Sequence, residues 1–474
     1  MKKNPAPAEE HIPALFPKTT KKGEKKKMVK EIEYWNPLIE TMPHTELKEL
    51  QTKKLLWMLR YAYLNSPFYH RLYDEANVKP EDIKTIDEYR KRVPFYKKDD
   101  IREQLRKTGD PFGGILAVPP ENLIMIHPST GTTGLNTFMP FTRNDYERIG
   151  QVSIRNCWMA KMRPKMKVVA NPIGWHWYAA SYQVAFLKLG VHEYVYGCIP
   201  HALTASHMFN AITRFKPEYC IAVLDVILGV NDVCRRLGMD PIDACDSLNY
   251  TLGTMGEAVT KKLRQTLQDT WGLEDLFDAG GIGDGLYALC DCRAHDGFHS
   301  WEDLYHIELI DDETQELLPT ASGERGEYLV SNLFHTSHPY VRFATEDYAE
   351  IFPEKCECGR THERIRVFGR TGWILHVADK KISTYDVHQV LEKLPEMPEA
   401  TFTMIKYADE MDELRLQAVY DETKTKDPED LKQRAEEALK KELGVKAVIE
   451  WVTFEEIPKI WHKIQRLTDL TKEA

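Results

Sequence analysis

The stretch HPSTGTTGLNTFMPFT, residues 127–142, gathers glycines and hydroxyl side chains at one turn between two short apolar runs. Backbone N–H groups that converge where no Cβ intervenes bind phosphate well. Gly131 and Gly134 allow that approach, and Ser129 with its neighbouring threonines adds hydroxyl donors. The pattern differs from GxxxxGK[ST], which excludes the usual nucleoside-triphosphatase loop. Taken alone, the residues leave a flexible loop, a phosphate cradle and a tight hairpin open.

Two cysteine pairs raise the question of a metal site. The chain has nine cysteines, of which four form the motifs CDC (290–292) and CEC (356–358). Disulfides are not expected in a chain whose N-terminus lacks the apolar segment of a signal peptide, and for which a cytoplasmic location is expected. Free, partly buried thiols remain the alternative to a metal. The five scattered cysteines fit small buried apolar residues.

The elements that must position these motifs change in character along the chain. A lysine-rich run at 17–30 predicts a flexible, solvated tail over 1–33. Apolar spacing predicts helices over about 34–106, with Thr45 as a helix N-cap. Strands at 167–174, 193–200 and 219–224 alternate with helices such as 204–215, which predicts an α/β sheet. The region after Asp296 is strand-rich, and a compact α+β unit closes the chain.

Bulk properties restrict the function. A length of 474 residues predicts two or more domains. The formal net charge of -10 argues against a general nucleic-acid surface. No apolar run approaches the ~20 residues that span a bilayer, so no membrane association is expected.

The ordered set of motifs resembles the adenylate-forming superfamily, and within it the phenylacetate–CoA ligase-like branch. The resemblance runs through residues 50–103, STGTTG (129–134), 295–333, 338–371 and 457–470, and it covers most of 34–470. It implies a large α/β adenylation domain with a β-rich subdomain at 34–370 and a small mobile α+β lid at 371–474. The expected reaction is ATP-dependent, AMP-forming activation of an aromatic or small carboxylic acid, followed by transfer to a thiol such as coenzyme A.

The resemblance also assigns roles to residues. Lys463 matches the late catalytic lysine, and Lys459 is its rival. Asp347 matches the acid that holds the ribose hydroxyls, Arg370 an arginine beside the ribose and phosphates, and Asp284 the acid linked to Mg²⁺. The full ATP-binding set is Ser129, Thr130, Gly131, Thr132, Thr133, Gly134, Gly256, Glu257, Asp284, Asp347 and Arg370.

A structural Zn²⁺ is implied in the same way. The branch has a matching arrangement, which gives Cys292, His299, Cys356 and Cys358 as four protein ligands and leaves no open position for catalysis. Cys290, His295 and His362 are alternative ligands.

The sequence departs from the family at functional loops. The phosphate loop continues as GLN (134–136) instead of lysine and proline, and GGIGD (280–284) replaces Tyr-Gly-Leu-Ser-Glu. In GRTGWILHVADKKIS (369–383), Gly372 and Trp373 replace two aspartates, and Asp379-Lys380 replace a glycine turn. These changes keep two alternatives open: transfer of the acyl group to an amine, carrier protein or other acceptor, and a non-catalytic nucleotide-binding protein.

The acyl pocket is expected at 171–183. Trp175, His176 and Trp177 would line it, stacking an aryl acid or leaving room for only a small one. Plain core packing is the competing interpretation. The expected partners are ATP and a small-molecule carboxylic acid, and the chain could form a homodimer.

Overall fold

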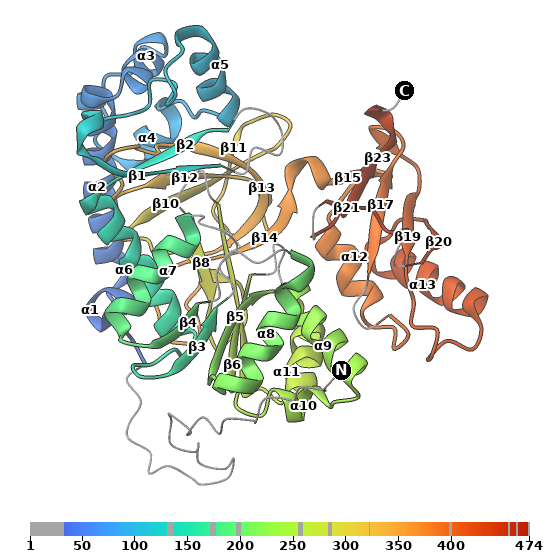
Figure 1. Ribbon diagram of the computed structural model, residues 1–474. Helices are drawn as coiled ribbons and strands as arrows, with labels where there is room; N and C mark the ends of the chain where they lie inside the picture. Colours follow the sequence, from blue (N-terminus) through green and yellow to red (C-terminus); the bar gives the residue numbers. More distant parts are fainter. Residues whose placement is uncertain are drawn as a thin grey trace, which may run out of the picture. The chain divides into compact units, whose positions relative to one another are not determined.

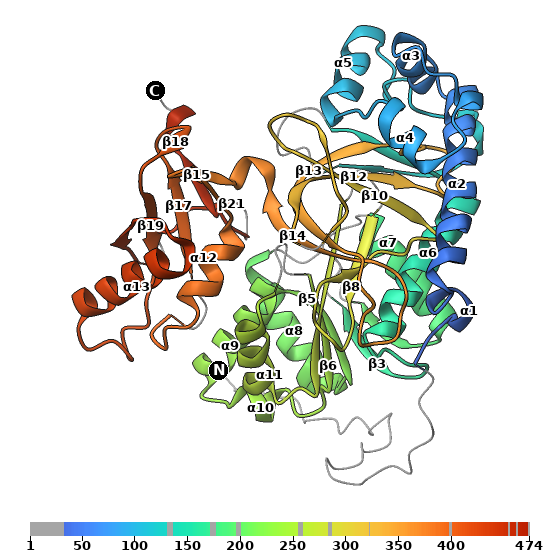
Figure 2. The same cartoon turned by 180° about the vertical axis from the view of Figure 1, so that it is seen from behind.

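The computed structural model describes residues 33–129, 136–170, 177–195, 201–254, 259–282, 287–321, 323–397, 401–453, 456–460 and 463–472 (Figures 1 and 2). These residues form an α/β structure with a helical N-terminal part and a C-terminal α+β part. The predicted fold class is confirmed.

The N-terminal part is helical, as the apolar spacing predicts. The long helix α2 (His44–Asn65) buries Leu55, Leu59 and other apolar residues at three-to-four spacing. The N-cap prediction for Thr45 was wrong. Pro43 is the N-cap, and its carbonyl already accepts from the Leu47 N–H, so Thr45 lies inside the first turn. The other helices of this part are α1 (Pro37–Glu40), α3 (Pro67–Glu75), α4 (Ile86–Arg92) and α5 (Lys98–Thr108).

A twelve-stranded sheet forms the centre of the large region, with the order β11-β10-β12-β13-β14-β9-β8-β7-β6-β5-β3-β4. One half is parallel and consists of β3 (Lys167–Ala170), β4 (His192–Val195), β5 (Tyr219–Val223), β6 (Tyr250–Thr254) and β7 (Asp275–Ile282). The three predicted strands correspond to β3, β4 and β5. The last residues of the first two predictions, 171–174 and 196–200, lie outside the described residues, and β5 ends one residue earlier than expected.

Helices cover both faces of the parallel strands, which explains their near-continuous apolar sequences. In β3, Val168 packs into the core that contains α6 and α7, while Val169 packs into the core built by α8, α9 and α11. Figure 1 shows α8 to α11 alongside these strands. The helices are α6 (Arg143–Met159), α7 (Trp177–Leu189), α8 (His201–Phe215), α9 (Leu224–Leu237), α10 (Pro241–Ala244) and α11 (Lys261–Trp271).

The other half of the sheet is antiparallel, as the strand-rich sequence after Asp296 predicts. Its strands are β8 (Tyr287–Asp291), β9 (Phe298–His299), β10 (Tyr305–Ile310), β11 (Leu317–Leu318), β12 (Arg325–Asn332), β13 (Phe343–Phe352) and β14 (Arg364–Arg370). A separate hairpin, β1 (Leu123–Pro128) and β2 (Phe138–Thr142), precedes α6.

The C-terminal part has its own four-stranded sheet of order β20-β19-β17-β23 and its own apolar core. Its strands are β17 (Phe402–Lys406), β19 (Leu414–Ala418), β20 (Ala447–Trp451) and β23 (Leu467–Asp469), with helices α12 (Thr384–Leu391) and α13 (Pro428–Leu443). Smaller pairings join β15 (Leu375–Val377), β16 (Lys380–Ile382) and β18 (Glu410–Met411), and join β21 (Lys459–Ile460) to β22 (Lys463–Ile464). These elements make up the compact α+β unit that the sequence predicts at the end of the chain.

Within the part of the chain that the structure describes, no helix combines the length and apolar character needed to cross a membrane.

Candidate active site and cysteine cluster

The glycine-containing stretch lies at the end of the β1–β2 hairpin. Pro128 pairs with Phe138, and beyond that pair the Ser129 N–H donates to the Thr137 carbonyl at 2.8 Å. The Thr137 N–H in turn donates to Ser129 Oγ at 3.0 Å. Ser129 is buried, and its two hydrogen bonds with Thr137 continue the pairing of the strands beyond Pro128 and Phe138.

A buried carboxylate anchors this hairpin to the rest of the site. Asp145, in the first turn of α6, forms a capping box with Thr142 at the end of β2. The same carboxylate accepts the backbone N–H groups of Thr336 at 2.8 Å and Ser337 at 3.3 Å. It thus connects the hairpin to the loop between β12 and β13.

Asp347 and Arg370 lie directly opposite each other on neighbouring strands. They are register partners in β13 and β14, and Arg370 Nε lies 3.3 Å from Asp347 Oδ1. The Asp347 side chain is 14% exposed and that of Arg370 is 50% exposed. The structure therefore brings together two residues predicted to bind the ribose and phosphates of ATP.

Unusual backbone conformations flank this pair. Glu346, beside Asp347, has φ of 59°, in the left-handed region that costs most residues about 1 kcal/mol or more. Its N–H donates to Glu327 Oε1 at 2.9 Å, which helps hold the conformation. Gly369, beside Arg370, has φ of 115°, which side-chain-bearing residues rarely adopt. Asp347 and Arg370 therefore each follow a residue with an unusual backbone conformation.

Several predicted site residues lie outside the described residues. These are Thr130, Gly131, Thr132, Thr133, Gly134, Gly256, Glu257, Asp284, Trp175 and His176. Trp177 begins α7, and Lys463 begins β22, where it is the register partner of Ile460. The roles proposed for all of these residues stay predictions.

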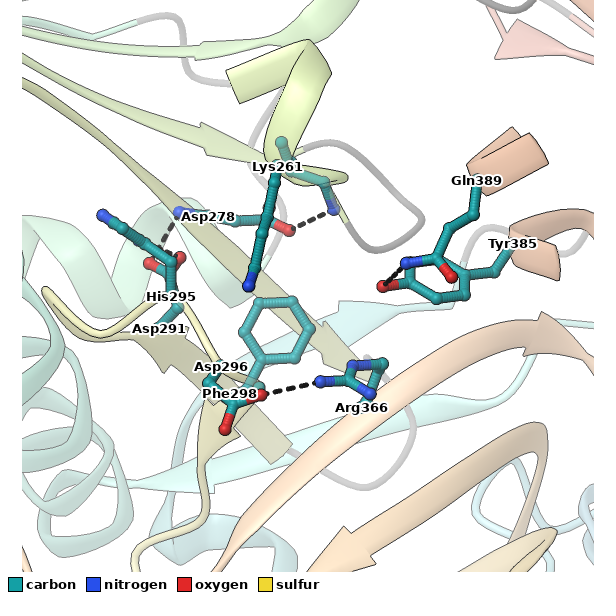
Figure 3. A pocket seen from close by; sticks show the side chains of 11 residues that line it. Lys261, Asp278, Asp291, His295, Asp296, Phe298, Arg366, Tyr385 and Gln389 are labelled. Atoms are coloured by element: carbon teal, nitrogen blue, oxygen red, sulfur yellow. Dashed lines mark hydrogen bonds and ion pairs between the residues drawn. The ribbon is translucent and has the colours of Figure 1, made fainter. Parts of the chain in front are cut away.

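Sequence reasoning missed a polar pocket that Val259 helps to line. A cavity of about 190 Å³ is lined by residues of α11, β7, β14 and α12, including Lys261, Asp278 and Arg366 (Figure 3). The buried Asp278 accepts the N–H of Val259 at 3.2 Å. The sequence signal that could have found it is Asp278, an acid between apolar residues in the middle of strand β7.

His295 lies at one side of this pocket as a cation between two carboxylates. Its ring nitrogens lie 2.8 Å from Asp291 and 3.0 Å from Asp275. Burial lowers the pKa of His295, but the hydrogen bonds to Asp275 and Asp291 outweigh it and raise the pKa to about 9. A protonated imidazole has no lone pair for a metal, so His295 does not fit the role of alternative zinc ligand.

Four buried side chains converge as the sequence predicts: Cys292, His299, Cys356 and Cys358. Their ligand atoms all lie within 4.8 Å of one another. Cys292 Sγ lies 3.6 Å from Cys356 Sγ, and Cys358 Sγ lies 3.3 Å from His299 Nε2. Zn–S bonds of about 2.3 Å in a tetrahedron separate two sulfurs by roughly 3.8 Å, so these spacings fit one zinc ion.

The other two alternative ligands are occupied elsewhere. Cys290 donates to the Asp291 carbonyl. His362 Nδ1 accepts the Glu302 N–H at 3.0 Å, and its Nε2 lies 3.1 Å from the Ile39 carbonyl. Burial lowers the pKa of His362 to about 4, so the ring is neutral and both nitrogens are used.

The cysteine cluster also joins the N-terminal helices to the sheet. The Cys358 carbonyl accepts the Tyr34 hydroxyl at 3.0 Å, and Arg360 forms a buried ion pair with Glu40 at 2.8 Å. Gly359 is required between them, because a Cβ there would lie 2.4 Å from the Tyr34 oxygen. The cluster therefore organises more than the strand-rich segment alone.

The altered hinge region contains a tight turn without glycine. Val377 of β15 pairs with Lys380 of β16, and the two residues between them, Ala378 and Asp379, have φ of 47° and 62°. Two-residue turns between antiparallel strands often need such positive φ values. The turn is present although the expected glycine is not.

Comparisons with known proteins agree with this architecture. A family described as the AMP-binding enzyme C-terminal domain matches residues 384–471. The phenylacetate-coenzyme A ligase of Thermus thermophilus is 29% identical over 398 residues, covering 81% of this chain and 83% of the relative. The enzyme of that name from Escherichia coli is 29% identical over 342 residues, covering 69% of this chain and 72% of its own.

A solved structure shares the fold. The crystal structure of 2-hydroxyisobutyryl-CoA ligase in the postadenylation state has a TM-score of 0.82 and 22% identity, with 94% of each chain covered. Together with the motif order and the paired Asp347 and Arg370, these findings support the resemblance of the chain to the phenylacetate–CoA ligase-like branch of the adenylate-forming superfamily.

Proposed function

We infer that this protein joins a carboxylic acid to coenzyme A in an ATP-dependent, AMP-forming reaction that proceeds through an acyl-adenylate. The observation that carries this inference is the pairing of Asp347 with Arg370. The match of residues 384–471 to the AMP-binding enzyme C-terminal domain supports it. The relatives named as phenylacetate-coenzyme A ligases make aryl acids the first substrates to test.

In this proposal, each of the site residues has a separate role in adenylation. Asp347 lies 3.3 Å from Arg370, and its carboxylate would accept the ribose hydroxyls. The half-exposed Arg370 could reach a phosphate oxygen while still in contact with Asp347. The turn at 130–134 would hold the ATP phosphates, and Lys463 would offset negative charge that builds on the α-phosphate during attack by the carboxylate.

Mg²⁺ would neutralise the phosphates and assist departure of pyrophosphate, with Asp284 as its proposed protein ligand. We further propose that residues 34–370 form the adenylation domain and 371–474 a lid that carries Lys463. The flexible tail at 1–33, the cytoplasmic location and a homodimer stay predictions.

The cysteine cluster is proposed to hold a structural Zn²⁺ through Cys292, His299, Cys356 and Cys358. Four protein ligands complete a tetrahedral zinc site, so the ion would stabilise the fold and take no part in the reaction. The connections from Cys358 to Tyr34 and from Arg360 to Glu40 explain what such an ion would stabilise.

Pyrophosphate–ATP exchange with a panel of acids tests the first half-reaction. The proposal expects acid-dependent exchange of labelled pyrophosphate into ATP in the presence of Mg²⁺, with phenylacetate and short acids in the panel. Absence of exchange with every acid, under conditions where a relative of known activity exchanges, would contradict it.

A further inference from the structure

A second cavity, of about 550 Å³, lies between the N-terminal helix α2 and the helix α6. Lys53, Lys54 and Trp57 line it from α2, and Arg148 and Arg155 line it from α6 at one-face spacing. Leu304, Leu333 and Phe334 add apolar surface. Its volume falls in the range of roughly 300–1,000 Å³ that is typical of small-molecule sites.

The lining of this α2–α6 groove carries an excess of positive charge. It has four cationic side chains and one carboxylate, Asp303. Arg155 binds that carboxylate through two buried hydrogen bonds of 2.7 and 2.9 Å. Of the other three cations in the lining, Lys53, Lys54 and Arg148, none forms an ion pair with Asp303, although its charge acts on the nearby Lys54.

Two of these three cations, Lys54 and Arg148, donate to neutral backbone carbonyl groups. Lys54 donates to the Asp303 backbone carbonyl at 2.7 Å, and Arg148 donates to the Phe334 carbonyl at 3.4 Å. Burial lowers the pKa of Lys54. The negative charge of Asp303 raises this pKa, whereas the positive charges of Arg155 and Arg148 lower it further. A bound anion would compensate all of these groups at once, because charge-assisted contacts to phosphate are strong.

An aromatic surface adjoins the cations. Trp57 is 51% exposed, and its ring stacks on Tyr61 with centroids 5.0 Å apart and an interplanar angle of 15°. Tyr61 is itself fixed by donating its hydroxyl hydrogen to the Ala117 carbonyl. A supported, half-exposed indole is a surface on which a nucleobase can stack, worth about 1–3 kcal/mol per base in known sites.

We propose that the α2–α6 groove binds a nucleoside that carries more than one phosphate group, with the base on Trp57 and the phosphates at Lys53, Lys54 and Arg148. Two sources share this chemistry: the 3′-phospho-ADP end of coenzyme A, and a free adenine nucleotide. The first rests on the proposed function, and the second does not. The groove is separate from the proposed ATP site, since neither Asp347 nor Arg370 lines it.

Calorimetric titration of the full chain with adenosine 3′,5′-bisphosphate and, separately, with ADP tests the groove. Arg148→Glu and Trp57→Ala are the test variants, since both side chains are exposed. Lys91→Glu, on an exposed lysine of α4, matches the charge change, and Leu64→Ala, at a residue of α2 that is 76% exposed, matches the loss of an apolar side chain.

The proposal predicts that both test variants weaken binding of at least one probe by about tenfold or more, while both controls stay within twofold. It also predicts that the affinity falls as salt increases. Binding of both probes that is unchanged in both test variants, or no binding by the wild type, would overturn it.

Steady-state kinetics then separate the two sources. A tenfold rise in KM for coenzyme A in Arg148→Glu, with KM for ATP unchanged, assigns the groove to coenzyme A. Loss of ADP binding with both KM values unchanged assigns it to a free nucleotide. If the wild type activates no acid, the proposed function fails, yet the titrations still decide whether the groove binds a nucleotide.

Discussion

Asp347 and Arg370 face each other across adjacent strands, with Arg370 Nε 3.3 Å from Asp347 Oδ1. The contact is partly exposed, so it is expected to contribute no more than about 1 kcal/mol to folding. We propose that the contact between Asp347 and Arg370 serves instead to orient both side chains toward ATP.

Asp347→Asn keeps the side-chain size and removes the charge. We expect kcat/KM for ATP in pyrophosphate exchange to fall by about tenfold or more, because an amide accepts fewer hydrogen bonds from ribose than a carboxylate. The free energy of unfolding should change by less than about 1 kcal/mol. Asp82→Asn, at an exposed residue of the N-terminal part, is the control and should leave both quantities unchanged. Equal kinetics in the two variants would remove Asp347 from the site.

Lys463→Ala should lower the rate of acid-dependent pyrophosphate exchange by about 10²-fold or more, since the amine is proposed to act on charge that develops in the transition state. Lys459→Ala, in the paired strand β21, is the matched control and should retain most of the activity. A larger loss in Lys459→Ala than in Lys463→Ala would exchange the two assignments.

Metal analysis of the purified chain should find about one zinc per molecule, because four buried ligands complete one tetrahedral site. Cys358→Ser should lose the zinc and lower the melting temperature. Cys220→Ser removes a buried thiol outside the cluster and should keep the zinc. A wild-type chain that contains no zinc after expression with ample metal would leave the cluster as free thiols.

Asp145→Asn should reveal a pH-dependent contribution to stability. Burial raises the pKa of Asp145, but His335 and hydrogen bonds from Thr142, Thr336 and Ser337 outweigh it and lower the pKa to about 2. A lowered pKa means that the carboxylate stabilises the fold above the unfolded value of 3.8 and loses this effect as pH falls toward 2. The contribution at stake is about 2 kcal/mol.

Urea unfolding of wild type and Asp145→Asn at pH 6 and pH 3 checks this. The wild type should be more stable by roughly 1–3 kcal/mol at pH 6, and this difference should shrink at pH 3. A difference that is the same at both pH values would show that the charge is not responsible.

Ala378→Gly should stabilise the C-terminal part by about 1 kcal/mol, because Ala378 has φ of 47° in the β15–β16 turn and glycine adopts this conformation without strain. Ala438→Gly, inside helix α13, should instead destabilise by about 1 kcal/mol. Equilibrium unfolding of both variants gives the comparison. Destabilisation by both would show that the turn is not strained at Ala378.

Local sequence signals predicted the elements better than the contacts between them. The apolar runs within 167–174 and 219–224 predicted strands that correspond to β3 and β5, because strands covered on both faces are apolar at successive positions. The helix at 428–443 has acids in its first turn and Gly444 after its last, which marks both ends. The N-cap prediction for Thr45 was wrong because several residues near the start of a helix can act as its N-cap. Only the backbone hydrogen bonds show which residue does so.

The candidate site was predictable only where motifs had a known counterpart. Cys292 and Cys356 are far apart in the chain, and their 3.6 Å approach depends on how β8, β9 and the 353–363 loop fold together. The α2–α6 groove gave no sequence signal at all, since Lys53 and Arg148 belong to separate amphipathic helices whose contact follows from packing. The Asp278 anchor of Val259 likewise required the parallel register of β6 and β7.

The most direct test of the central claim is chromatographic and mass-spectrometric measurement of products from the wild-type chain with ATP, Mg²⁺, coenzyme A and one acid at a time, starting with phenylacetate. Our account predicts that at least one acid yields its acyl-CoA together with AMP in equal amounts. AMP formed without acyl-CoA would point to another acceptor, and no AMP with any acid would contradict the assignment as a ligase.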